Sequence, residues 1–93
     1  MSLLKGKTAI ITGAARGIGR QIAISMAKEG ANIAFTDLNM DENMESLEKE
    51  LSEFGVNAKG YASDASDFDQ TQQVVEDIQK EFGSIDILVN NAG

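Results

Sequence analysis

The stretch TGAARGIG, residues 12–19, lies between a short apolar run at 8–11 and an amphipathic run at 18–29. Its three glycines therefore fall where a strand is expected to turn into a helix. A helix N-terminus offers unpaired backbone N–H groups and a partial positive charge to an anion. Glycine, which has no Cβ, lets a phosphate approach the backbone closely. The sequence thus predicts a phosphate-binding turn, although glycines at a helix start can also serve close packing of the helix on the strand.

Hydrophobic periodicity divides the rest of the chain into alternating short apolar runs and longer segments with helical spacing. This alternation is typical of a parallel sheet covered by helices. We expect strands at 8–12, 32–36, 58–62 and 85–89, and helices at 18–29, 41–54 and 67–82. Right-handed crossovers then give the strand order 3-2-1-4. The prediction is an α/β fold of Rossmann type with three αβα layers, forming one domain over residues 1–93.

Each expected helix carries an apolar face for the sheet. The residues predicted to point inward are Ile18, Ile22, Ala23, Met26 and Ala27, then Met44, Leu47, Leu51 and Phe54, then Val74, Val75, Ile78 and Phe82. Asp41 is the expected N-cap of the second helix, and Gly55 and Gly83 end the second and third helices. The opposite, acidic face of the second helix is expected to be solvated.

Composition excludes several classes of function. The net charge is −7 and the eight Lys and Arg residues are scattered, which argues against nucleic acid or an anionic membrane as partner. No apolar run resembles a membrane span or a signal peptide, so we expect a cytoplasmic protein. The chain has no Cys and no His. We therefore expect no metal site, and any chemistry by these residues must use carboxylates, hydroxyls or Lys.

An acidic residue, Asp37, stands 24 positions after Gly13, at the expected end of the second strand. A dinucleotide site is expected to have an acid roughly 20 residues after its glycine turn, where it accepts hydrogen bonds from the adenosine ribose. A P-loop is excluded because Gly19 is followed by Arg20 and Gln21. An S-adenosylmethionine site also combines a glycine loop with an acid, but its glycine spacing differs. The pattern favours a dinucleotide.

Other polar residues at the same edge of the predicted sheet have simpler alternatives. Asp64 follows the third strand and fits an ordinary Asx turn. Asn90 and Asn91 follow the fourth strand and could tie loop backbone together. Tyr61 lies in a strand and has Ala65, not Lys, four residues later, so we interpret it as a packing residue.

Three segments together resemble the short-chain dehydrogenase/reductase family: Gly13-xxx-Gly17-x-Gly19 after Thr12, Asp64, and Asn-Asn-Ala-Gly at 90–93. The resemblance covers essentially the whole chain. Within the family, TGAARGIG and DILVNNAG at 86–93 are most similar to the bacterial 3-oxoacyl-(acyl-carrier-protein) reductases of fatty acid biosynthesis. Related sugar, steroid and hydroxy-acid dehydrogenases share these segments, so the substrate stays open.

The resemblance implies a role for each matching residue. Asp37 would accept hydrogen bonds from the adenosine ribose, Asp64 and Ala65 would meet the adenine edge, and Asn91 would line the ribose on the nicotinamide side. The residues implied to hold the pyrophosphate and adenosine ribose lie in the loop, namely Gly13, Arg16, Gly17, Ile18 and Gly19. The residues implied to brace the sheet are Asn90, Ala92 and Gly93.

The choice of cofactor depends on two residues that point in opposite directions. Reductases of the resembled subfamily usually use NADP(H), and Arg16 resembles a residue that can pair with a 2′-phosphate. Asp37 favours NAD(H), because its carboxylate would lie close to that phosphate and repel it. We therefore expect NAD(H), with NADP(H) as the alternative.

The resemblance also implies that a catalytic Ser, a Tyr-xxx-Lys pair and an Asn follow the Asn-Asn-Ala-Gly segment, and no residue of this chain matches them. We expect the N-terminal cofactor-binding half of an oxidoreductase, inactive by itself. Its parent would act on a small carbonyl or acyl substrate as a homotetramer. The half alone would self-associate through the exposed fourth strand. The alternative is a non-catalytic nucleotide-binding module.

Overall fold

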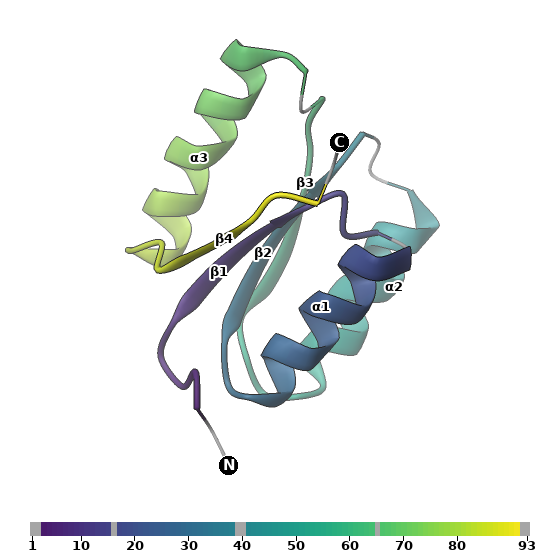
Figure 1. The fold of residues 1–93 in the computed structure, drawn as a ribbon, viewed down its shortest axis with the longest axis vertical. Helices are drawn as coiled ribbons and strands as arrows, with labels where there is room; N and C mark the ends of the chain where they lie inside the picture. The colour runs from purple at the N-terminus through teal and green to yellow at the C-terminus, as the bar shows by residue number, and fades with distance from the viewer. Residues whose placement is uncertain (1–2, 16, 39–40, 65, 92–93) are drawn as a thin grey trace.

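The computed structural model describes residues 3–15, 17–38, 41–64 and 66–91. These residues form one parallel sheet of β1 (Thr8–Thr12), β2 (Asn32–Asp37), β3 (Ala58–Ala62) and β4 (Ile87–Val89), in the order β3-β2-β1-β4. One face is covered by α1 (Gly17–Lys28) and α2 (Glu42–Ser52), and the other by α3 (Phe68–Phe82) (Figure 1). The predicted fold class and strand order are confirmed.

The register of the sheet brings the carboxyl ends of the strands to one edge. Thr12 pairs with Thr36, and Asp37 pairs with Ala62 on the other side of β2. The short β4 pairs Val89 with Ile11 of β1. The loops that follow all four strands therefore begin along one edge, which is where open α/β sheets bind their ligands.

Alternation along the strands builds a core on each face of the sheet. Ile11, Ile33 and Phe35 are fully buried on the face that packs against α1 and α2, together with Met44 and other residues of the helices. The core on the other face is smaller and contains Ile10, Ala34 and Ile78, with Tyr61 packed against it. The predicted packing role of Tyr61 is confirmed.

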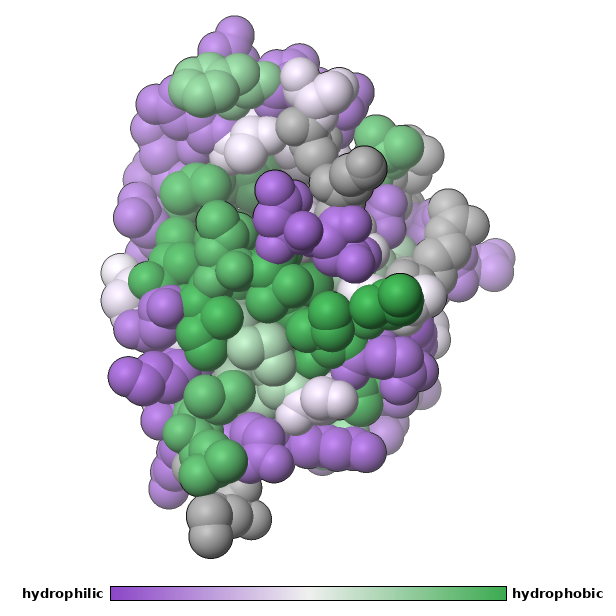
Figure 2. All heavy atoms as spheres, viewed as in Figure 1, coloured by the Kyte–Doolittle hydropathy of each residue, from purple (hydrophilic) through white to green (hydrophobic). Residues whose placement is uncertain are grey.

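The face covered by α3 alone remains partly open. Figure 2 shows apolar side chains gathered over β4 and the adjoining side of α3. A groove of about 290 Å³ runs between these elements, and Ile10, Val74, Ile85 and Leu88 are among the residues that line it. The side chain of Leu88 is 67% exposed.

The buried face of α1 differs from the prediction by one residue. Gly19, Ala23 and Ala27 are buried against the sheet, whereas Ile18 is 72% exposed. Ile22 and Met26 are only partly buried at the margin of the core. Positions 19, 23 and 27 follow the same four-residue spacing as 18, 22 and 26, and their small side chains let the helix approach the strands closely. The prediction that Ile18 points inward is wrong.

The ends of the other helices follow local hydrogen bonds. The carboxylate of Asp41 accepts hydrogen bonds from the backbone N–H of Asn43 and of Met44, so the predicted N-cap of α2 is confirmed. The helix ends at Ser52, two residues before the predicted end, and Phe54 is exposed instead of buried. Gly83 ends α3 as predicted, with φ of 90°.

The outer face of α2 is less uniformly solvated than predicted. Glu42, Glu45 and Glu53 are exposed, but Glu48 and Glu50 are half-buried and bonded. Oε2 of Glu48 accepts a hydrogen bond of 2.7 Å from the backbone N–H of Gly60, in the strand at the sheet edge. This bond satisfies an N–H group that an edge strand would otherwise leave unpaired.

The fourth strand begins later than predicted, and just before it Asp86 is bonded to Thr8 of β1 through its side chain and its backbone. The backbone N–H of Thr8 donates to Oδ2 of Asp86 at 2.9 Å, and the carbonyl oxygen of Thr8 accepts from the N–H of Asp86. Ile85 and Asp86 lie before the strand, which starts at Ile87. None of the helices in the described parts of the chain is long and apolar enough to cross a membrane.

Candidate functional site

The candidate site lies at the carboxyl edge of the sheet, where the loop after β1 meets the ends of β2 and β4. The backbone N–H of Ala14 donates to the carbonyl oxygen of Thr36 at 3.2 Å. Nδ2 of Asn91 donates to the carbonyl oxygen of Gly13, also at 3.2 Å. The glycine loop is thus fastened on one side to β2 and on the other to the segment after β4.

The three glycines of the loop are required for two different reasons. Gly13 and Gly17 have φ of 64° and 66°, a left-handed backbone that L residues adopt at a cost. Gly19 is required for space, because a Cβ there would lie 2.5 Å from the carbonyl oxygen of Gly13 and 2.6 Å from Nδ2 of Asn91. Gly19 therefore serves close packing, but against the loop and the segment after β4, and not against the strand as the alternative expected.

The surroundings of Gly17 are open. A Cβ built on Gly17 would have no described heavy atom within 4 Å. Gly17 is the first residue of α1, and the first turn of this helix holds no acidic residue, whereas α2 has Glu42 and Glu45 and α3 has Asp69 there. The open side of Gly17 and the absence of an acid from the first turn of α1 are both compatible with an anion at this helix N-terminus.

Asp37 is half-buried at the end of β2 and is held against the glycine loop. Its Oδ2 accepts a hydrogen bond from the backbone N–H of Ala15 at 3.1 Å, and its Oδ1 accepts one from the N–H of Leu38 at 2.8 Å. A carboxylate has about four acceptor positions, so two remain for hydroxyl groups of a ligand. The structure therefore places a fixed acceptor beside the loop.

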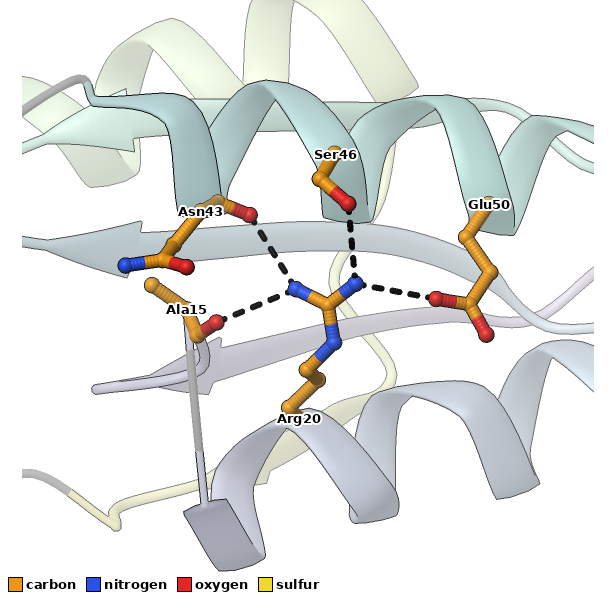
Figure 3. A network of polar contacts seen from close by, with 5 residues as sticks. All are labelled: Ala15, Arg20, Asn43, Ser46 and Glu50. Atoms are coloured by element: carbon orange, nitrogen blue, oxygen red, sulfur yellow. Dashed lines mark hydrogen bonds and ion pairs between the residues drawn. The ribbon is translucent and has the colours of Figure 1, made fainter.

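Arg20 makes contacts that were not predicted from the sequence (Figure 3). Its Nη1 donates to the carbonyl oxygens of Ala15 and Asn43, both at 3.1 Å. Its Nη2 donates to Oγ of Ser46 at 3.2 Å and forms an ion pair with Oε1 of Glu50 at 2.9 Å. Arg20 thereby joins the glycine loop to α2. No local pattern indicates these bonds, because the partners on α2 lie 23 to 30 residues away in sequence.

Asp64 forms the Asx turn that was the simpler alternative. Its Oδ1 accepts hydrogen bonds from the hydroxyl of Ser66 at 2.7 Å and from the N–H of Ser66 at 2.9 Å. These two donors hold the pKa of the Asp64 carboxyl below its ordinary value of 3.8, the hydroxyl having the larger effect. The hydrogen bonds described for Asp64 all join it to residues 66–70. A role at the adenine edge stays a prediction.

The segment after β4 is bonded to the end of β1. The hydroxyl of Thr12 donates to Oδ1 of Asn90 at 3.1 Å and accepts from the backbone N–H of Asn91 at 3.0 Å. The alternative in which these amides tie loop backbone together is therefore confirmed for Asn91, whose Nδ2 bonds the Gly13 carbonyl oxygen, whereas the amide oxygen of Asn90 bonds a side chain. The role of Asn91 beside a ribose stays a prediction.

The structure brings Gly13, Gly19, Asp37 and Asn91 together around the glycine loop. Asp64 is one strand further away, although the N–H of Ser63 beside it donates to the carbonyl oxygen of Asp37 at 2.7 Å. Other predicted positions lie outside the described residues, namely Arg16, Ala65, Ala92 and Gly93.

A glycine turn between β1 and α1, an acid at the end of β2 and the strand order β3-β2-β1-β4 define a dinucleotide-binding α/β class. The family model described as short chain dehydrogenase matches residues 7–93. This chain belongs to that family, and the family predicted from the sequence is confirmed.

Individual relatives support the same assignment. The chain is 39% identical to the 3-oxoacyl-(acyl-carrier-protein) reductase of Staphylococcus aureus strain Mu50, over 94% of this chain and 35% of the relative. A solved structure of NAD+-bound xylitol dehydrogenase superimposes with a TM-score of 0.93 at 37% identity, covering 98% of this chain and 35% of that one. A short chain dehydrogenase from Mycobacterium paratuberculosis bound to NAD gives 0.91 at 33% identity, with 97% and 38% covered.

These relatives define how far the likeness extends. The chain spans about a third of the length of the curated relatives it matches, 35% for the Staphylococcus aureus reductase. Both solved structures contain bound NAD. The reductase and the xylitol dehydrogenase are named for different substrates, so these relatives do not select one substrate.

Proposed function

We propose that residues 1–93 form the cofactor-binding part of a dehydrogenase or reductase that transfers a hydride between NAD(H) and a carbonyl or alcohol group. The observation that carries this proposal is the position of Asp37, whose carboxylate is fixed beside Ala15 in the glycine loop. In this family fold, an acid at that place binds the ribose hydroxyls of adenosine.

The proposed path of the cofactor follows the edge of the sheet. The pyrophosphate would lie at the N-terminus of α1, over Gly17 and the backbone N–H of Ile18, where the structure leaves space. Adenine would extend toward Asp64, and the nicotinamide end toward Asn91. Arg16 and Ala65 complete the proposed binding residues.

The cofactor preference depends on charge. With Oδ1 and Oδ2 each bonded to a backbone N–H, Asp37 has a fixed orientation. A 2′-phosphate placed near this carboxylate would experience repulsion on the order of 1 kcal/mol or more, even when partly solvated. NADH has a hydroxyl in the same place, which can donate to the carboxylate. We therefore propose NADH as the preferred cofactor, and NADPH as the alternative that Arg16 would support.

The reaction itself needs groups that these residues do not supply. The sequence has no Tyr-xxx-Lys pair, since Tyr61, its one tyrosine, is followed by Ala65 at the fourth position. The hydroxyl of Tyr61 is also buried, so it is not available to a substrate. We expect the 93 residues to bind cofactor without turnover. For the intact protein we propose a small carbonyl or acyl substrate, with the oxoacyl reductases as the first class to test, and a homotetrameric assembly.

Calorimetric titration of the intact protein with NADH, NADPH and S-adenosylmethionine tests the proposal. We expect NADH to bind most tightly. Asp37→Asn keeps the shape of the side chain and removes its charge. It should raise the Kd for NADH by about tenfold and reduce the difference between the Kd values for NADH and NADPH. Asp69→Asn, which removes an exposed acid from α3, is the matched control.

Two outcomes of this titration would contradict the proposal. Binding of neither nicotinamide cofactor would reject the site, and tighter binding of NADPH would reject the preference assigned to Asp37. The class of function is decided by a separate assay. Cofactor binding by an intact protein that transfers no hydride to carbonyl substrates would favour a non-catalytic nucleotide-binding module.

A further inference from the structure

We propose that Arg20 is a positioning residue for the adenosine end of the cofactor site, which holds the Ala15 peptide against Asp37 and so sharpens the preference for NADH over NADPH. The inference rests on the proposed function, and it assigns to Arg20 a task that the glycine pattern does not indicate. Its basis is the pair of bonds made by a single residue, Ala15.

Both backbone polar groups of Ala15 are engaged, one by Asp37 and the other by Arg20. Its N–H donates to Oδ2 of Asp37 at 3.1 Å, and its carbonyl oxygen accepts from Nη1 of Arg20 at 3.1 Å. The residue is 3% exposed, so water does not compete freely for either bond. Rotation of this part of the loop would break a charge-assisted bond on each side. Ala15 therefore couples the position of Asp37 to that of Arg20.

Arg20 is in turn fixed by α2. Its terminal nitrogens donate to the carbonyl oxygen of Asn43, to Oγ of Ser46 and to Oε1 of Glu50, in addition to Ala15 (Figure 3). These four acceptors match the four N–H groups that the two terminal nitrogens carry. The side chain of Arg20 is only 21% exposed. A guanidinium with its terminal donors engaged by protein acceptors is suited to fixing the loop and not to contacting the cofactor directly.

The consequence for the cofactor concerns the orientation of the Asp37 carboxylate. While Ala15 is held, Oδ2 of Asp37 stays fixed toward the loop, and the carboxylate would present a constant geometry to a bound adenosine ribose. If Ala15 is released, the carboxylate can rotate away. NADH then loses a well-placed acceptor, and NADPH escapes part of the repulsion. Loss of the Arg20 contacts should therefore reduce the discrimination between the two cofactors as well as the affinity for NADH.

The test compares Kd values for NADH and NADPH in the intact protein and its variants. Arg20→Met removes all four bonds, Arg20→Lys keeps the charge with fewer donors, and Glu50→Gln removes only the charge of the partner. Lys59→Met is the matched control, because Lys59, like Arg20, joins two elements through an ion pair: its Nζ lies 2.8 Å from Oε1 of Glu81, which links β3 to α3 away from the glycine loop. Thermal melting of each variant reports whether it is folded.

The expected results separate positioning from general destabilisation. Arg20→Met should raise Kd for NADH by about tenfold and that for NADPH less, so that their ratio falls by about threefold or more. Glu50→Gln should shift the ratio in the same direction by less, and Arg20→Lys should restore part of the preference. Lys59→Met should leave both Kd values within about twofold.

Several results would overturn the inference. If folded Arg20→Met has an unchanged ratio of Kd values, or binds both cofactors more weakly by the same factor, the role of Arg20 is purely structural. The proposed function would still stand if the preference for NADH depends on Asp37. If Arg20→Met does not fold, unchanged ratios in both Arg20→Lys and Glu50→Gln have the same meaning. Failure of the wild type to bind either cofactor would reject the proposed function, and the inference with it.

Discussion

The side-chain amide of Asn91 donates a hydrogen bond of 3.2 Å to the carbonyl oxygen of Gly13, across 78 positions of sequence. The same amide nitrogen lies only 2.6 Å from the position that a Cβ on Gly19 would take. The start of α1, the glycine loop and the segment after β4 are therefore packed to a single geometry. A change at any of these three places should be transmitted to the other two.

We expect Gly19→Ala to destabilise the protein by about 2 kcal/mol, because the new methyl group would overlap with Gly13 and Asn91. Urea denaturation measures the loss. Gly55→Ala is the comparison, since Gly55 has a positive φ of 82° but a Cβ added there would meet no described atom within 4 Å. It should cost about 1 kcal/mol from backbone strain alone. Equal stability of Gly19→Ala and the wild type would show that the loop yields easily.

We expect Tyr61→Phe to leave stability unchanged or to raise it by up to about 1 kcal/mol. The Tyr61 hydroxyl is buried and has no hydrogen-bond partner among the described residues. On folding, this hydroxyl therefore loses its hydrogen bonds to water without gaining a bond in the protein. The ring contacts stay, including the Lys59 ammonium 5.3 Å from the ring centroid. Tyr61→Leu, which also removes the ring, should destabilise. A loss of more than about 1 kcal/mol in Tyr61→Phe would indicate that the hydroxyl has a bonding partner, such as water.

The sheet could be predicted from sequence because its strands are short apolar runs bounded by turn residues. The bounds of β1 and β3, at 8–12 and 58–62, agree with the prediction, and the strand order follows from right-handed crossovers. The helix ends at Asp41 and Gly83 could also be predicted from the sequence, because each residue acts on the backbone of its own turn. Features that depend on residues close together in sequence could therefore be predicted.

Features that depend on contacts between residues distant in sequence could not be predicted from the sequence. Ile18 and Gly19 satisfy the same helical spacing, and only the close approach of α1 to the sheet selects the small residue. The bonds of Arg20 require α2 to lie beside the glycine loop, a tertiary relationship that spacing within α1 does not contain. The side-chain bond between Asp86 and Thr8 likewise joins residues 78 positions apart in sequence.

We expect Ser66→Ala to raise the pKa of the Asp64 carboxyl toward its ordinary value of 3.8, because the hydroxyl is the stronger of its two donors. In the native protein the depressed pKa means that Asp64 favours the folded state at pH values above the unfolded pKa. This contribution is lost as the pH falls through the folded pKa. Stability should therefore depend less on pH below about 4 in the variant than in the wild type.

A carbon-detected NMR titration of Asp64 measures the shift directly. Ser52→Ala is the control, because the Ser52 hydroxyl bonds the carbonyl oxygen of Glu48 in α2, remote from this turn. An Asp64 pKa that does not move in Ser66→Ala would contradict the assignment of Ser66 as the main cause.

We expect the 93-residue chain to self-associate through β4, and Leu88→Lys to weaken that association. Among the described residues β4 pairs only with β1, so its other edge has free backbone groups, and Leu88 within this strand is 67% exposed. Charge on an exposed edge strand opposes pairing with another chain. Leu3→Lys is the matched control, because Leu3 is 69% exposed and lies outside the sheet.

Sedimentation velocity over a range of concentrations should show oligomers for the wild type and for Leu3→Lys, and mostly monomer for Leu88→Lys. A wild-type chain that sediments as a monomer at all concentrations would refute the prediction, and equal association of the two Lys variants would place the contact elsewhere.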